Sequence, residues 1–147
     1  MLFSKSWNYS IRALIYLAEH SDEGLILSSV IAKEESIPGP FLAKILGTLA
    51  SANIIESTRG PKGGFVLKAD PEKITLLLIA QQLEHFEISG KCLLGYGACE
   101  NGEPCPIHEF WAESERQIIK FLEDTTLAKI CRLVPQEKRR ELIEKME

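Results

Sequence analysis

Long apolar runs, a general excess of positive charge and a large number of cysteines are all missing from this 147-residue chain. No apolar run reaches the roughly 20 residues that a membrane-spanning helix needs. The first residues also lack the apolar core and the cleavage site of a signal peptide. With 45% hydrophobic and 26% charged residues, the composition is that of an ordinary globular domain. We therefore expect a cytoplasmic protein with no membrane partner.

The net charge of −4 taken alone argues weakly against a nucleic-acid partner. The charges are unevenly distributed, however. Residues 1–70 carry seven basic and seven acidic side chains, whereas residues 71–147 carry ten and fourteen. The first half can therefore still present a local basic surface, although no broad basic patch is evident. No nucleophile–base pair or pair of catalytic carboxylates stands out, so we do not expect an enzyme.

Three helices are predicted in the first half. In residues 6–21 the apolar side chains recur at steps of three and four, which is the spacing of one helix face. Ser28 is of a type that caps helices, and it is expected to start a second helix over residues 28–35. A Pro-Gly-Pro break then precedes a third helix over residues 40–51, with Pro40 in its first turn. The side chains expected to be buried on the second and third helices are Val30, Ile31, Ala32, Phe41, Leu42, Ile45, Leu46 and Leu49.

A β-hairpin with a basic, glycine-rich tip is predicted after the third helix. Residues 54–58 and 65–68 favour strands, and they flank the segment Arg-Gly-Pro-Lys-Gly-Gly at 59–64. Helix, helix, break, helix and basic hairpin is the order of a winged helix-turn-helix. In that fold the third helix enters the DNA major groove and the hairpin, or wing, contacts phosphate or the minor groove. The candidate DNA-contacting residues are Pro40, Lys44, Thr48, Arg59, Gly60, Pro61 and Lys62.

Two other interpretations of this half remain open. The same order of elements occurs in small domains that never bind DNA, and the charges of Arg59 and Lys62 could simply be solvated. A phosphate-binding loop over residues 60–64 is a much poorer interpretation, because the Lys-Ser/Thr ending of a P-loop is missing.

The second half, residues 71–147, is predicted to hold a ligand loop and a dimerisation helix. An apolar helix over residues 74–84 precedes the loop at 89–108, and a long helix follows from Pro106 to about Asp124. Its apolar residues form a seam at steps of three and four that suits another long helix, so we expect a two-fold homodimer. Packing against helices of the same chain is the alternative. The seam residues are Ile107, Phe110, Trp111, Ser114, Ile118, Phe121 and Leu122; the shorter helices expected to finish the chain cover residues 127–133 and 135–145.

The loop holds three of the four cysteines in the spacing C-x6-C-x5-C-x2-H, from Cys92 through Cys99 and Cys105 to His108. Four such donors on one Gly- and Pro-rich loop are typical of a metal site, and thiolates select zinc, copper(I) or iron–sulfur clusters. Structural zinc usually takes pairs of ligands two to four residues apart. The wider gaps favour a larger group such as a cluster. Cys131 lies in an apolar helix and is expected to be a small buried side chain.

Together, the wing Arg59-Gly-Pro-Lys-Gly-Gly-Phe65 and the three cysteines with a Cys-x-x-His about thirty residues later resemble the iron–sulfur cluster regulators. This family of bacterial winged-helix repressors and activators includes the IscR and the nitric-oxide-sensing NsrR branches. The resemblance implies a mainly α fold with a small β-hairpin, in which a winged helix-turn-helix domain is joined to a long dimerisation helix. It also implies a homodimer on a palindromic operator in double-stranded promoter DNA.

The resemblance to the IscR-like branch implies a 2Fe–2S cluster held by Cys92, Cys99, Cys105 and His108. It likewise carries the wing arginine to Arg59 and the recognition helix to residues 40–51. The nitric-oxide-sensing branch uses a 4Fe–4S cluster with an acidic ligand near the start of the first helix. Here that neighbourhood reads Trp-Asn-Tyr at 7–9, which favours the 2Fe–2S cluster. A cluster-free thiol redox switch, a 4Fe–4S nitric-oxide sensor and a small electron carrier are the alternatives.

Overall fold

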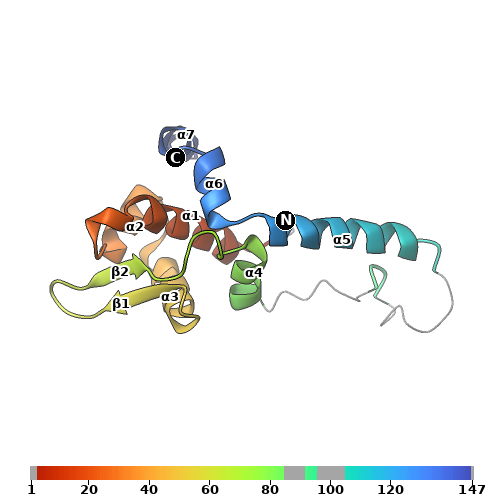
Figure 1. Ribbon diagram of the computed structural model, residues 1–147, viewed down its shortest axis with the longest axis horizontal. Coiled ribbons are helices and arrows are strands. Elements are labelled where there is room, and N and C mark those ends of the chain that lie inside the picture. The colour runs from red at the N-terminus through yellow and green to blue at the C-terminus, as the bar shows by residue number, and fades with distance from the viewer. Residues whose placement is uncertain (1–2, 85–91, 96–104, 147) are drawn as a thin grey trace.

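The computed structural model describes residues 3–84, 92–95 and 105–146, and it is mostly helical with one antiparallel hairpin (Figure 1). Cys99, one of the four predicted cluster ligands, lies outside the described residues. Within the described part the elements are α1 (Lys5–Glu19), the 3-10 turn η1 (Ser21–Glu23), α2 (Ser28–Glu34), α3 (Gly39–Ser51), β1 (Ile55–Thr58), β2 (Gly64–Leu67), α4 (Leu76–Glu84), α5 (His108–Asp124), α6 (Leu127–Leu133) and α7 (Gln136–Glu144).

Helix α1 is the central element of the body, by which we mean α1 to α4, the hairpin and α6. Ser4 caps it, because its hydroxyl oxygen accepts a hydrogen bond from the Trp7 amide at 3.2 Å. Most of the apolar residues of α1 lie on one broad face and are buried. The helix packs against α3, α4 and α6. The buried hydroxyl of Ser10 donates to the Trp7 carbonyl at 2.6 Å, so this polar group in the core is satisfied.

Two details of the predicted α2 and α3 are wrong. Ser28 is the first residue of α2 and not its cap; Leu27 occupies the cap position and makes no side-chain cap hydrogen bond. Val30 is 39% exposed and Phe41 is 48% exposed, although both were expected in the core. Ile31 is fully buried, as are Leu42, Leu46 and Leu49 on the inner face of α3. The burial of Val30 and Phe41 was mispredicted for the same reason. Each lies at the edge of the apolar face of its helix, and that face is narrower than the sequence suggests.

The hairpin is held in register by four facing pairs, from Ile55 with Leu67 to Thr58 with Gly64. Phe65 on β2 also bridges to Ile26, which lies just before α2. This bridge, with bonds of 2.9 and 2.8 Å between the two backbones, attaches the hairpin to the helix-turn-helix. The wing and α3 are therefore fixed relative to one another.

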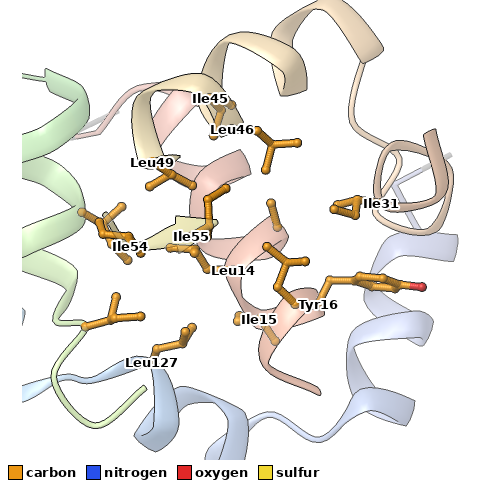
Figure 2. Close-up of a cluster of buried hydrophobic side chains, with 14 of the residues drawn as sticks. Leu14, Ile15, Tyr16, Ile31, Ile45, Leu46, Leu49, Ile54, Ile55 and Leu127 are labelled. Carbon is orange, nitrogen blue, oxygen red and sulfur yellow. The ribbon is translucent and has the colours of Figure 1, made fainter. Parts of the chain in front are cut away.

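The core combines side chains from both halves of the sequence (Figure 2). Leu14, Leu46 and Leu49 from the first half are fully buried, and so are Ile74 and Leu127 from the second. A bridge between Thr75 and Thr126 joins the start of α4 to the start of α6. The segments on either side of α5 thus meet in the body.

Helix α5 extends away from this body, as Figure 1 shows in cyan and blue at the right of the view. Its C-terminal end packs against α4, and Leu122 is its one buried residue. The helix starts two residues later than predicted and ends where predicted, at Asp124. In the described part of the chain, no helix has the length and apolar character needed to cross a membrane.

Candidate functional site

Helix α3 lies beside the hairpin and packs against β1 (Figure 1). Burial of Leu42, Leu46 and Leu49 fixes the rotation of α3 about its axis. Pro40 and Lys44 are therefore exposed, while Thr48 is half-buried. The Thr48 hydroxyl donates to the Lys44 carbonyl at 3.2 Å. The structure thus places the three candidate residues of α3 on one accessible surface.

The tip of the wing also presents its candidate residues to solvent. Arg59, Gly60, Pro61 and Lys62 are all exposed. Neither basic side chain forms an ion pair with any residue that the structure describes. Two such cations on the tip of a hairpin, next to an accessible helix, are suited to binding phosphate groups.

Glycines give the wing its shape. Gly60 has a φ of 112°, in the region that favours glycine, and its carbonyl accepts from the Gly63 amide at 2.9 Å. A Cβ on Gly64 would lie 2.7 Å from the Ile26 carbonyl oxygen. Gly64 therefore allows the hairpin to approach the segment before α2 closely.

The described part of the ligand loop forms a small cavity at the start of α5. Cys92, Cys105 and His108 all line it, together with the apolar residues Leu93, Leu94, Ile107 and Trp111. Cys92 thus shares one cavity with Cys105 and His108, which lie 13 and 16 positions later in the sequence. The fourth predicted ligand, Cys99, lies outside the described residues, and its role stays a prediction from the sequence.

His108 is the first residue of α5, and its backbone amide donates to the Cys105 carbonyl at 2.9 Å. Its Nδ1 atom is buried and has no hydrogen-bond partner among the described residues. A buried polar atom without a partner is rare and calls for an explanation such as an ion or a water molecule. A metal bound in the cavity would satisfy this nitrogen.

The donor types at this cavity are ones that bind metal ions and iron–sulfur clusters. Among the described residues, no three His, Cys, Asp or Glu side chains come close enough to hold one metal ion. Three of the predicted ligands nevertheless line the same cavity. A 2Fe–2S cluster distributes its ligands over two iron atoms, so its donors need not converge on one point. Thiol and imidazole are also the donor types that such clusters use.

Cys131 lies apart from the loop, half-buried on α6. Burial raises the pKa of its thiol, with a further contribution from Glu19. A thiol with a raised pKa is less often a thiolate, which is the form that reacts and binds metals. The structure therefore agrees with the expectation that Cys131 is a packing residue.

A buried charge network, which was not predicted from the sequence, joins α7 to the helix-turn-helix. Arg139 contacts Glu19 at 2.5 Å and Glu35 at 3.4 Å, and Arg12 contacts Glu35 at 3.4 Å. Glu35, directly after α2, is 2% exposed. The pairs are separated by up to 120 residues, so no local sequence signal could have found them.

The comparisons with known proteins agree with this geometry. Residues 3–133 match the model of the Rrf2 family, described as iron-dependent transcriptional regulators. A protein of Aquifex aeolicus, provisionally assigned as an HTH-type transcriptional regulator, is 37% identical over 129 residues, which are 86% of this chain and 89% of that protein. The regulator IscR of Vibrio campbellii is 26% identical over 132 residues, which are 90% of this chain and 78% of IscR.

Known structures show the same fold. CymR, the global cysteine regulator of B. subtilis, has a TM-score of 0.77 and 27% identity, with 89% of this chain and 96% of CymR covered. IscR of T. potens has a TM-score of 0.73 and 23% identity, with 92% and 90% covered.

A helix-turn-helix with an accessible third helix and a basic hairpin defines a winged-helix transcriptional regulator, and such regulators bind DNA. The chain belongs to the Rrf2 family of transcriptional regulators. Its relatives are regulators and not enzymes, in agreement with the expectation from the sequence.

Proposed function

We propose that the chain is a homodimeric regulator that senses iron–sulfur, redox or nitric oxide status through a 2Fe–2S cluster. The ligands would be Cys92, Cys99, Cys105 and His108. The observation that carries this proposal is the buried, unpartnered Nδ1 of His108 in a cavity that Cys92 and Cys105 also line. When bound, the cluster would supply a group that changes its oxidation state or is lost when oxidants or nitric oxide reach it.

The ligand loop is connected directly to the dimerisation helix. His108 is both a proposed ligand and the first residue of α5, and its amide is bonded to the Cys105 carbonyl. A change in the arrangement of these two residues would therefore move the start of α5. Because one end of α5 packs on the body, such a movement would alter how the two DNA-binding units of a dimer are spaced.

The apolar face of α5 supports the homodimer. Phe110 is 77% exposed and Phe121 is 60% exposed, and both lie on the predicted seam. The described residues of the same chain cover little of this face, because α5 packs against α4 at one end. The same helix of a second copy would cover it and would give the two-fold symmetry that a palindromic operator requires. On this proposal, residues 1–70 contact DNA and residues 71–147 supply the ligand loop and the dimer contact.

Arg59 and Lys62 would hold the wing against the DNA backbone, while Pro40, Lys44 and Thr48 approach the major groove. Arg59→Ala should weaken binding to a promoter duplex by about 1–3 kcal/mol. Lys129→Ala, which removes an exposed cation from α6, is the matched control and should bind as the wild type does. Fluorescence anisotropy measures the affinity of each protein for the duplex. Equal affinities for the wild type and Arg59→Ala would show that Arg59 does not contribute to DNA binding.

The ligand assignment is tested by iron and sulfide content after anaerobic purification. We expect Cys105→Ala and His108→Ala to lose most of the bound iron while remaining folded. Cys131→Ala is the matched control, because Cys131 lies on α6 away from the cavity and should retain the metal. If His108→Ala keeps full iron, the fourth ligand lies elsewhere and a 4Fe–4S cluster becomes the better assignment.

The likeness to CymR favours a second candidate, a thiol switch without a cluster. A structure of Staphylococcus aureus CymR in its oxidized form has a TM-score of 0.68 and 28% identity to this chain, with 86% of this chain and 93% of that chain covered. In this chain the switch would use the loop cysteines, because the pKa of Cys131 is raised by burial. Mass spectrometry under oxidising and reducing conditions separates the candidates. A reversible loss of two hydrogens in a protein that never binds iron would support the switch.

A further inference from the structure

The outward face of α3 carries few groups that can recognise bases by hydrogen bonding. Lys44 is the one charged residue of this helix, and the helix contains no Arg, Asn or Gln. Asn and Gln make the two-point contacts that identify adenine in the major groove, and Arg or Lys makes the contact that identifies guanine. Lys44 is therefore the one side chain of α3 that is suited to guanine. The exposed positions around Lys44 are instead small or apolar.

The two hydroxyl groups of α3 are already engaged. Thr48 donates to the Lys44 carbonyl at 3.2 Å, and Ser51 donates to the Gly47 carbonyl at 3.0 Å. A hydroxyl has one proton, so each of these oxygens remains available only as an acceptor. Neither can donate to guanine O6 or N7 without first giving up its bond to the helix.

Phe41, in the first turn of α3, is the large exposed side chain of this face. Its ring meets the ring of Tyr9 edge-on, with the centroids 6.1 Å apart at 79°. The guanidinium of Arg12 lies 5.8 Å from the centroid of Tyr9. Phe41 is thus supported by a neighbouring ring while remaining 48% exposed.

Small neighbours allow this face to approach DNA closely. Phe41, Lys44 and Thr48 follow one another at steps of three and four, so they share a side of the helix. Gly47 lies next to them on the exposed surface, and a Cβ there would meet nothing within 4 Å. A phenyl ring on a helix with little other bulk can therefore reach into a groove.

We infer that α3 recognises thymine methyl groups, with the Phe41 ring as the main contact and the Thr48 methyl as the second. This inference rests on the proposed binding of operator DNA by α3. The C5 methyl of thymine is the one apolar feature of the major-groove edge, and apolar side chains are its natural partners. The positions under Phe41 and Thr48 are accordingly thymines in A·T pairs, whereas Lys44 can contact guanine elsewhere in the half-site.

The test uses duplexes that the full-length wild-type protein selects from a random-sequence pool. We expect each half-site to contain fixed thymines. One selected duplex is then made with deoxyuridine in place of thymidine at each position in turn, which removes the methyl and keeps the base pair. Loss of one buried methyl should weaken wild-type binding about four-fold at the position under Phe41.

Phe41→Ala should bind the thymine and uracil duplexes equally at that position, and Phe41→Leu should retain part of the preference. Their melting temperatures show whether the contact with Tyr9 is needed for folding. Arg59→Ala is the matched control, because it should weaken binding to both duplexes by the same factor. A thymine preference that survives in Phe41→Ala, or half-sites without fixed thymines, would overturn the inference while leaving DNA binding intact. Failure to select any duplex would overturn both this inference and the proposed function.

Discussion

The body and α5 are both built from amphipathic helices, but among residues 3–84, 92–95 and 105–146 only the body has its apolar faces covered. In the body, Leu14, Leu42 and Leu46 are fully buried. On α5, Phe110 and Phe121 are largely exposed, and Leu122 is buried where the helix reaches α4. Apolar residues at steps of three and four are therefore buried in the body, where other described helices cover them, and exposed on most of α5. On the proposed function, the body would carry the stability of one copy and α5 would carry association.

The largest effect is expected in the core of the body. Leu14→Ala should lower the free energy of unfolding by about 4 kcal/mol, because it removes buried apolar surface and leaves a cavity. The matched control is Leu133→Ala at the end of α6, where the side chain is 70% exposed. Denaturant unfolding measures both variants. Similar losses would show that burial in the body does not carry the stability of the chain.

A somewhat smaller effect is expected from Arg139→Met, which breaks the network between α7 and the helix-turn-helix. Arg139 is 8% exposed and pairs with Glu19 and Glu35. Its removal leaves the partly buried Glu19 without this ion pair and the buried Glu35 with Arg12 as its basic partner. We expect a loss of about 3 kcal/mol in the same unfolding measurement. Arg140→Met on the same helix, where the side chain is exposed, should change little. If both variants behave alike, the charge network does not attach α7 to the body.

On α5, the comparison predicts a change in association and not in folding. Phe110→Ala should raise the free energy of dimerisation by about 2 kcal/mol, as loss of an aromatic anchor does at an interface. Sedimentation equilibrium measures the dissociation constant. Glu123→Ala, on the opposite side of α5, should leave it unchanged. A Phe110→Ala protein that remains as tightly dimeric as the wild type would place the interface elsewhere.

The smallest effect is a pH dependence that belongs to the body. Burial raises the pKa of Glu35 above its ordinary value, and the negative charge of Glu19 adds to this increase. The positive charges of Arg139 and Arg12 act in the opposite direction but do not cancel it. The folded state therefore holds this proton more tightly than the unfolded chain. The resulting stability is present below the ordinary pKa of about 4.3 and is lost as the pH rises through the raised pKa.

Unfolding measured against pH for the wild type and Glu35→Gln tests this prediction, since glutamine does not titrate. The wild type should lose stability relative to the variant as the pH rises from the acidic end. A relative gain in stability over that range would mean that the two arginines lower the pKa of Glu35 by more than burial raises it.

Local patterns predicted most of the elements in both regions. The helix of residues 127–133 has the predicted bounds, and α5 ends at the predicted Asp124. The seam on α5 was visible because its apolar residues repeat at steps of three and four. The cap at Ser28 was mispredicted because residue type alone does not fix the position at which a helix begins.

The parts that the sequence did not predict depend on contacts between distant segments. Arg139 and Glu35 meet only once α7 has folded against α2. The exposure of Phe41 depends on which face of α3 the core covers. The ligand role of the loop stays a prediction from its spacing. The structure adds the shared cavity of Cys92, Cys105 and His108, and the His108 Nδ1 atom that has no hydrogen-bond partner among the described residues.

The visible absorption spectrum of anaerobically purified protein, with iron and acid-labile sulfide measured on the same sample, tests the proposed cluster most directly. The account predicts bands between about 400 and 600 nm with about two irons and two sulfides per chain, as a 2Fe–2S cluster requires. A colourless protein with zinc or free thiols, even after attempted reconstitution of the cluster, would contradict it.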